Sequence, residues 1–365
     1  MTVPTTSPRR FLSLDVFRGA TIVAMILVNN PGDRSVAYSQ LLHSPWHGFT
    51  FADTIFPAFL WIAGFALTLS MRARAGRGDD RAALLVHAVK RAAVLFVCGL
   101  LLEGFPYFDL DHYQLTGVLQ KIAISYLLAY IVCLYAGWRG QLLALGLLFV
   151  AYIAFMLGVT PPNCPDGAWS ATCNASKYLN DALLGGHMWE TPSHNDPDGV
   201  VGCLSATASV LLGTLSAWLF AVAGPAPAAL RKLTLLAAAL VVAGAVLSLA
   251  VPINKILWTP SYSLFMAGIS AAAFVLVFWL TDVRGYCRWG QPLRVFGLNA
   301  LAAYILSRLG VDLLKMHIAG WSIYHDLLLG LASPTVASLL FACLNVVAVY
   351  FIVWVMYRLH IFVKL

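Results

Sequence analysis

The chain has 365 residues, of which 60% are hydrophobic and only 11% charged, and its formal net charge is +7. A soluble domain carries roughly a quarter charged residues because its surface faces water, so this composition excludes an ordinary soluble globular protein. The hydrophobic residues occur in blocks of about 20, which is the length of helix that crosses about 30 Å of hydrocarbon. The alternating pattern of a membrane barrel is absent, and we therefore expect an all-α polytopic membrane protein.

About ten such blocks follow one another along the chain. The first, at residues 20–29, is short and is extended by residues 11–19. The others are expected at residues 51–70, 89–102, 117–135, 142–157, 201–222, 233–251, 262–281, 295–313 and 336–356. A shorter apolar stretch at 321–331 is interpreted as re-entrant or interfacial. We interpret residues 1–365 as a single membrane domain with two long outer segments, at about 31–50 and 160–200.

Basic residues are distributed unevenly over the segments between these blocks. If the N-terminus is cytoplasmic, the cytoplasmic side holds 17 of the 23 Lys and Arg residues and 4 of the 16 Asp and Glu residues, while the other side holds 6 and 12. Because cytoplasmic loops carry the excess of positive charge, both termini are predicted to be cytoplasmic and the number of spans to be even. The net positive charge is explained by topology and gives no separate support for nucleic-acid binding.

Two of the seven cysteines, Cys164 and Cys173, share the second outer segment. On the oxidising face of a membrane such a pair is expected to form a disulfide. The other five lie in or near apolar blocks, where a free thiol behaves as a small hydrophobic group. No CxxC or HExxH spacing occurs, so the sequence predicts no metal site.

Three polar residues flank the first outer segment. Asn29 ends the first block, His43 lies in the segment and Asp53 opens the second block. A hairpin of two helices can bring them to one mouth of the bundle. There a histidine could act as a general base, a carboxylate could orient its ring and a carboxamide could stabilise an oxyanion. Helix capping and solvation of a loop are the alternative explanations for these residues.

A basic cluster lies on the predicted cytoplasmic side. Arg18 follows Asp15 by three positions, so the two are neighbours on a helix and could simply anchor it at the membrane edge. Alternatively, Arg18 belongs to a basic mouth that binds phosphate groups, because guanidinium and ammonium groups are the usual partners of phosphates. The residues of this mouth would be Arg18, Arg72, Lys90, Arg91 and Arg294.

Polar side chains also occur within the predicted blocks. Gln120 and Lys121 lie just inside the fourth, Glu103 ends the third, and Asn299 lies inside the ninth. Ionisable groups at membrane depth are costly and are often functional. Lys121 could instead reach the interface, and Asn299 could instead bond a neighbouring helix.

Two further outer segments combine groups that suit a sugar. The DPDG sequence at 196–199 is typical of a tight turn. The PINKILW sequence at 252–258 offers amide, amine and indole groups, although a tryptophan at an interface is equally explained by the aromatic belt. The candidate sugar-binding residues are Asp196, Asp198, Asn254, Lys255 and Trp258.

In order and spacing, these segments resemble the heparan-α-glucosaminide N-acetyltransferases and their bacterial NagX-like relatives. The matching segments are LDVFRG at 14–19, VN at 28–29, HSPWHG at 43–48, ADTIFP at 52–57, GVLQK at 117–121, DPDG at 196–199 and PINKILW at 252–258. The resemblance implies a multi-span, dimeric enzyme. Such an enzyme takes acetyl-CoA from the cytosol and acetylates the amine of a glucosamine-type sugar on the far side of the membrane.

The resemblance also implies roles for particular residues. His43 matches the active-site histidine of the family, Asn29 its neighbouring asparagine, and Asp53 lies in the matching ADTIFP segment. Acetyl-CoA would bind the basic mouth together with Gln120 and Lys121, and the acceptor sugar would bind the DPDG and PINKILW segments.

Two other functions remain open from the sequence. Polar groups within many spans also describe an inner-membrane permease for amino sugars or N-acetylglucosamine, but no convincing pair of Gly- or Pro-broken spans occurs in the two halves. The opening motif is shared with transmembrane acyltransferases, so O-acylation of envelope polysaccharide is the third option. Compact loops and the lack of a recognisable targeting signal indicate a bacterial inner membrane, where heparan is not an expected substrate.

Overall fold

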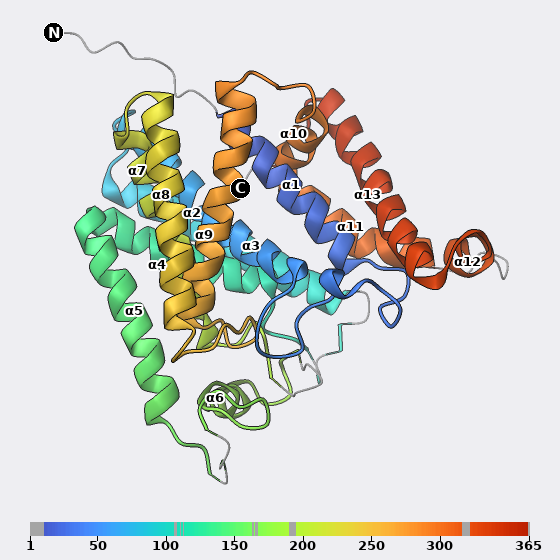
Figure 1. Ribbon diagram of the computed structural model, residues 1–365, viewed down its shortest axis with the longest axis horizontal. Coiled ribbons are helices and arrows are strands. Elements are labelled where there is room, and N and C mark those ends of the chain that lie inside the picture. Colours follow the sequence, from blue (N-terminus) through green and yellow to red (C-terminus); the bar gives the residue numbers. More distant parts are fainter. Residues whose placement is uncertain are drawn as a thin grey trace.

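The computed structural model describes residues 11–105, 108–109, 111, 113–162, 164, 167–189, 195–315 and 322–363, with the backbone alone for 311–315. Nine helices in these ranges are long and apolar enough to cross a membrane. An isolated antiparallel bridge joins His47 and Asn254. The prediction of an all-α polytopic membrane protein is therefore confirmed (Figure 1).

The nine candidate spans are α1 Leu12–Asn29, α2 Phe51–Ala75, α3 Arg81–Gly104, α4 Val118–Tyr135, α5 Trp138–Gly158, α7 Gly202–Val222, α8 Ala226–Leu247, α9 Pro260–Phe278 with its π-helical continuation Trp279–Val283, and α13 Pro334–Arg358. The shorter elements are the 3-10 turn Ser39–Leu41, α6 Ala175–Leu184, α10 Gln291–Leu298, α11 Ala300–Lys315, the π-helical turn Ile323–Leu328 and α12 Leu329–Leu331. The amphipathic helix α6 lies within the second outer segment, where no helix was predicted.

The prediction of one continuous span at residues 295–313 is wrong. The structure divides this region into α10 and α11, with Asn299 between them in a non-helical conformation (φ −123°, ψ 41°). The Asn299 side chain donates to Ile361 O at 3.1 Å and accepts from Val363 N at 3.0 Å. Asn299 therefore binds the segment after α13 and not a neighbouring helix. Hydropathy does not reveal this break, since a single polar residue hardly changes the average over the block.

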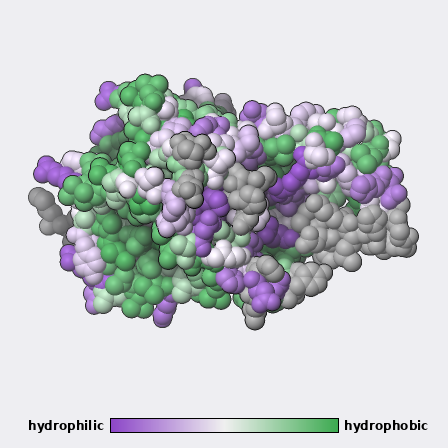
Figure 2. Space-filling model, turned by 90° about the horizontal axis from the view of Figure 1, so that it is seen from below, coloured by the Kyte–Doolittle hydropathy of each residue, from purple (hydrophilic) through white to green (hydrophobic). Residues whose placement is uncertain are grey.

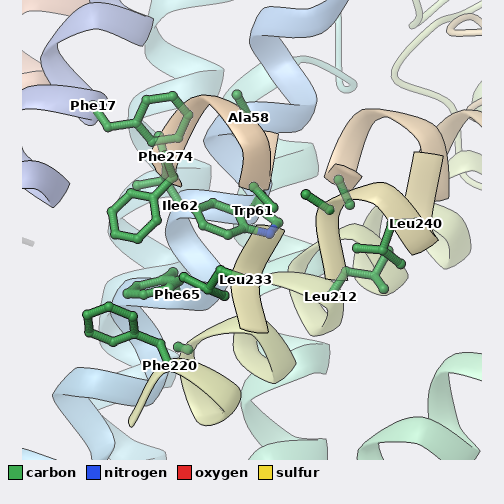
Figure 3. Packing of buried hydrophobic residues seen from close by; sticks show 14 of the residues in the cluster. Phe17, Ala58, Trp61, Ile62, Phe65, Leu212, Phe220, Leu233, Leu240 and Phe274 are labelled. Carbon is green, nitrogen blue, oxygen red and sulfur yellow. The ribbon is translucent and has the colours of Figure 1, made fainter. Parts of the chain in front are cut away.

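Aromatic side chains from four helices form the centre of the largest core cluster. Phe17 on α1, Trp61 and Phe65 on α2, Phe220 on α7 and Phe274 on α9 are all buried and lie against one another (Figure 3). The ring centroids of Phe65 and Phe274 are 4.8 Å apart. Because lipid is itself apolar, such contacts stabilise a membrane bundle through close packing and not through exclusion from water.

Helices α2 and α7 approach each other through paired glycines. A Cβ atom on Gly64 would lie 1.9 Å from Val210 O, and a Cβ atom on Gly213 would lie 2.1 Å from Trp61 O. Small residues are the usual means by which two membrane helices bring their backbones together. The contact fixes α2, whose first turn carries Asp53, against α7, which follows the DPDG segment.

We expect Gly213→Leu to lower the free energy of unfolding by about 3 kcal/mol, the upper end of the usual cost of overpacking, because the side chain would have to displace the backbone of α2. The measurement is thermal unfolding of the purified protein in detergent. Gly146→Leu on α5 is the matched control, since a Cβ atom there meets nothing within 4 Å. Equal stability of the two variants would contradict this packing.

Candidate functional site

Loops that are far apart in the sequence meet at one end of the bundle. In Figure 1 the segment after α1 and the turn after α8 both lie at the lower end of the helices, near α6. Figure 2 views the molecule from below and shows hydrophilic residues gathered across the middle of this face, with hydrophobic residues covering much of its left side. The candidate site lies among these loops.

Asp53 is held by the start of its own helix. As the third residue of α2 it forms a capping box with Thr50, whose backbone N and hydroxyl donate to Asp53 Oδ2 at 3.0 and 3.1 Å. Ser44 N donates to the same oxygen at 3.0 Å. The side chain of Asp53 is fully buried, and its other oxygen, Oδ1, lies 2.8 Å from His43 Nδ1. The helix cap thus aims one carboxylate oxygen at His43.

This contact determines how the His43 ring can act. A proton on Nδ1 can be donated to Asp53, which leaves Nε2 as the basic nitrogen. The His43 side chain is 38% exposed, so the ring is open to a ligand on one side. Burial lowers the pKa of His43; the hydrogen bond that its ring donates to Asp53 raises the pKa, and the charges of Lys255 and Arg34 lower it further. The ring is therefore unprotonated over a wider pH range than an ordinary histidine.

Lys255 approaches the same pair from the turn after α8. Its Nζ atom lies 2.9 Å from His43 Nδ1 and 3.4 Å from Asp53 Oδ1. The turn is joined to the His43 segment by the bond from Gly48 N to Ile253 O at 2.8 Å. Burial lowers the pKa of Lys255, and the charge of Asp53 opposes this shift. The structure thus brings together three predicted residues that the sequence assigned to two separate sets.

Trp258 ends this turn in a strained conformation. Its φ of 52° is in the left-handed region, which a bulky side chain rarely adopts. The ring is fully buried and covers the Lys121 ammonium at 4.2 Å from the ring centroid. Asn254 is fully buried as well, and its Oδ1 accepts from Leu257 N. The sequence predicted that Trp258 and Asn254 bind a sugar; in the structure both side chains are fully buried and shape the turn.

Lys121 connects this turn to the DPDG segment. Its Nζ atom, almost fully buried, donates to Pro197 O at 2.7 Å. Burial raises the pKa of Asp196 to about 6, with the nearby Asp198 adding to the shift. Burial also raises the pKa of Asp198, against the opposing charges of Lys121, Lys255 and His43. The link between the two predicted sets is Lys121, which bonds the DPDG segment and lies under the Trp258 ring of the turn that carries Lys255.

Two predicted residues are less closely connected to it. Asn29 ends α1 half-buried, and its backbone oxygen accepts from Arg34; over the described residues no hydrogen bond joins its side chain to His43 or Asp53. Gln120 is buried against Gly99, with neither amide atom bonded within the described chain. Gln120 and Lys121 lie at the His43 end of α4 and not with the basic cluster.

A cavity of about 430 Å³ lies inside the bundle among α1, α2, α3, α4, α10 and α11. Arg18, Arg91 and Ser70 line one end, and Phe59 and Leu119 line it toward the other. Along α2, Ser70 and Phe59 are eleven positions apart, which corresponds to about 16 Å of helix. From Phe59 a further six residues, or about 9 Å, lead to Asp53. The wall between is largely apolar.

The predicted basic mouth is only partly formed by this cavity. Arg18 and Arg91 line it, whereas Arg72 and Lys90 are exposed and Arg294 is half-buried outside its wall. Arg18 also donates to Gly297 O at 3.3 Å, and Arg91 lies over the ring of Tyr126. The two guanidinium groups are thus placed at the edge of the cavity by neighbouring helices.

Sequence analysis missed several residues that build the site. Thr50 and Ser44 hold Asp53, and Tyr262 donates its hydroxyl to Asp53 O at 2.6 Å. The Thr50-x-x-Asp53 spacing is that of a capping box and could have indicated this role. The contact of Tyr262 joins residues 209 positions apart, and no local pattern reveals it.

The second outer segment is crosslinked. Cys164 and Cys173 form a disulfide with their Cα atoms 5.6 Å apart. The bond closes a short loop beside the His43 segment, where Trp46 Nε1 donates to Trp169 O at 2.9 Å. No group of three or more potential metal ligands occurs among the described residues.

The fold and site define a polytopic membrane protein in which a histidine paired with a buried aspartate lies beyond one end of a cavity edged by two arginines. The family model described as heparan-alpha-glucosaminide N-acetyltransferase, catalytic, matches residues 10–182. That range includes His43, Asp53, Arg18 and Arg91.

The chain is also similar to the heparan-alpha-glucosaminide N-acetyltransferases of two mammals. It is 25% identical to that of Mus musculus over 357 residues, covering 82% of this chain and 53% of the relative. It is 26% identical to that of Homo sapiens over 356 residues, covering 82% and 52%. The predicted resemblance is confirmed, and the chain spans about half the length of the curated relatives it matches.

Proposed function

We propose that this protein is a transmembrane N-acetyltransferase that moves an acetyl group from cytosolic acetyl-CoA to the amine of a glucosamine-type sugar on the outer side of the membrane. The observation that carries the proposal is the pairing of two features. A buried carboxylate orients His43 at one end of the bundle, and a cavity edged by Arg18 and Arg91 leads from the other end toward it.

The cavity suits the shape and charge of the donor. Arginines bind phosphate oxygens through two parallel hydrogen bonds, so Arg18 and Arg91 would hold the phosphates of coenzyme A. The apolar wall would hold its long, slender arm. If the arm extends about 16 Å along the cavity, from the level of Ser70 to that of Phe59, the thioester lies within two turns of α2 from Asp53.

The acceptor would bind where acidic groups gather. Asp196 and Asp198 attract the ammonium group of a glucosamine unit, which must lose a proton before it can attack a thioester. His43 Nε2 takes that proton, and the amine nitrogen forms a bond to the acetyl carbon. The bond from carbon to sulfur then breaks, and the second proton lost by the nitrogen passes to the sulfur, which releases coenzyme A as a thiol. In this proposal Asn29 donates to the carbonyl oxygen as negative charge develops on it.

The orientation follows from the same assignment. The Arg18 end faces the cytosol, the His43 end faces the opposite side, and both termini lie in the cytoplasm. An even number of crossings then requires α10 and α11 to cross together as the tenth passage. We further propose a single-domain homodimer in a bacterial inner membrane, on the strength of the family resemblance and the compact loops.

The first test of the function is the His43→Ala variant. Purified protein is given radiolabelled acetyl-CoA and glucosamine, and N-acetylglucosamine is measured. We expect the variant to lose about 10²–10⁴-fold in rate, because a general base contributes in that range. His187→Ala is the control, since that outer histidine bonds Tyr113 O and is not part of the site. Full activity in His43→Ala would exclude His43 as the general base, and no acetylation by the wild type would favour an amino-sugar permease.

The donor site is tested by two neighbouring cations on α3. Arg91 lines the cavity and Lys90 is exposed outside it. Arg91→Ala should raise the KM for acetyl-CoA by about 10-fold or more, as expected for loss of a charge-assisted hydrogen bond. Lys90→Ala should leave it unchanged. Equal effects of the two substitutions would mean that the cavity is not the donor site.

The charge of Lys255 should appear in the pH profile of kcat/KM, which rises as His43 loses its proton. Burial and Lys255 both lower the pKa of His43. Lys255→Met removes one of these causes, so the His43 pKa should rise and the acidic limb should move to higher pH. Lys177→Met, which breaks an exposed ion pair with Asp181, should not move it. An unshifted limb in Lys255→Met would show that His43 is not the group that titrates.

A further inference from the structure

A second cavity, of about 340 Å³, opens on the surface beside the His43 segment. Its wall consists of Trp46, His47 and residues 167–171. Trp46 and Trp169 are half-buried, so each presents part of its ring to the opening. We call this the Trp46–Trp169 pocket. None of the predicted catalytic or binding residues lies in its wall.

The aromatic wall is held from behind. Tyr152 stacks on Trp169 with an interplanar angle of 12° and ring centroids 6.5 Å apart. Tyr152 is fully buried, and its hydroxyl donates to Leu257 O at 2.8 Å. Trp46 Nε1 donates to Trp169 O. The two tryptophan rings are therefore fixed in place before any ligand binds, which lowers the entropic cost of binding.

The other wall of the pocket is equally constrained. The disulfide between Cys164 and Cys173 brackets residues 167–171. Asn174 Nδ2 donates to Ser170 O at 3.0 Å, and Asn195 Nδ2 donates to Ala171 O at 2.8 Å. A loop held by a crosslink and two buried amides keeps its shape, as a binding wall must.

The pocket lies next to His43. Asn254 Nδ2 is 3.5 Å from His47 Nδ1, and the adjacent residue Lys255 has its Nζ 2.9 Å from His43 Nδ1. Since consecutive Cα atoms are about 3.8 Å apart, one turn contacts the histidine of the pocket and the histidine of the proposed active site. A chain of sugar rings that places one ring at His43 can therefore place the next at the pocket.

The charge of the pocket limits its ligand. Among the residues that the structure describes, its wall contains no Lys, Arg, Asp or Glu side chain. Burial lowers the pKa of His47, so that ring is neutral near pH 7. A sulfated sugar would need cationic partners, which this wall does not supply. The apolar faces of an uncharged pyranose ring suit tryptophan, and its hydroxyls suit Ser170 and the backbone.

We propose that the Trp46–Trp169 pocket binds an uncharged sugar ring adjoining the glucosamine unit, so that the acceptor is an unsulfated oligosaccharide. The role of this sugar as part of the acceptor rests on the proposed function, whereas its binding to the pocket does not. Because the described wall carries no cationic side chain, we expect the pocket to bind a sulfated sugar poorly.

The first experiment compares kcat/KM for glucosamine, for glucosaminyl-β-1,4-N-acetylglucosamine, and for the same disaccharide with a 6-O-sulfate on its second ring. We expect about a tenfold preference for the neutral disaccharide over glucosamine, equivalent to about 1.4 kcal/mol, and no such gain for the sulfated one. Trp169→Ala should abolish the preference and Trp169→Phe should retain part of it. Trp189→Ala, an exposed outer tryptophan, should keep it.

The second experiment measures binding without chemistry. N,N′-diacetylchitobiose has no free amine, and its binding is followed by tryptophan fluorescence in the wild type, Trp169→Ala and Trp189→Ala. Binding that is lost only in Trp169→Ala supports the pocket, even if no acceptor is acetylated. No binding by the wild type, or equal rates with all three acceptors, overturns it. Failure to acetylate any acceptor, with binding intact, overturns the proposed function instead.

Discussion

The carboxylate of Asp53 is the group on which the rest of the site depends. A fully buried carboxylate is unfavourable unless its oxygens are bonded, and here Ser44, Thr50, His43 and Lys255 supply the partners. One side chain therefore caps α2, fixes the loop after α1, orients an imidazole and attracts a lysine from the turn after α8. Any change that leaves Asp53 unpaired would disturb all of these at once.

The positions of charged groups at this end follow from the same requirement. Lys121 is almost fully buried and Lys255 largely so. A carbonyl oxygen and an aromatic face compensate Lys121 for the lost hydration, and the carboxylate of Asp53 compensates Lys255. The charges of both lysines oppose the rise in the pKa of Asp198 that burial causes. The polar site is thus a set of opposite charges that compensate one another at one end of an apolar bundle.

The sequence was sufficient for those features that depend on local pattern. Spans could be predicted from block length, and the contact of His43 with Asp53 follows from a hairpin of two adjacent helices. The contact of Lys255 with His43 joins residues 212 positions apart, and its geometry depends on the packing of α2, α7 and α9. The burial of Trp258 and the break at Asn299 were not predictable, because both depend on which backbone or side chain happens to lie opposite in the folded bundle.

The break at Asn299 connects the wall of the cavity to the segment that follows α13. Phe362 and Val363 form part of the cavity wall, and the amide of Asn299 holds the backbone on either side of Phe362 much as a neighbouring strand would. This part of the cavity wall is therefore formed by two segments of the chain that Asn299 joins through hydrogen bonds. Because Phe362 and Val363 follow α13 directly, a shift of α13 along its neighbours would move them and change the volume of the cavity.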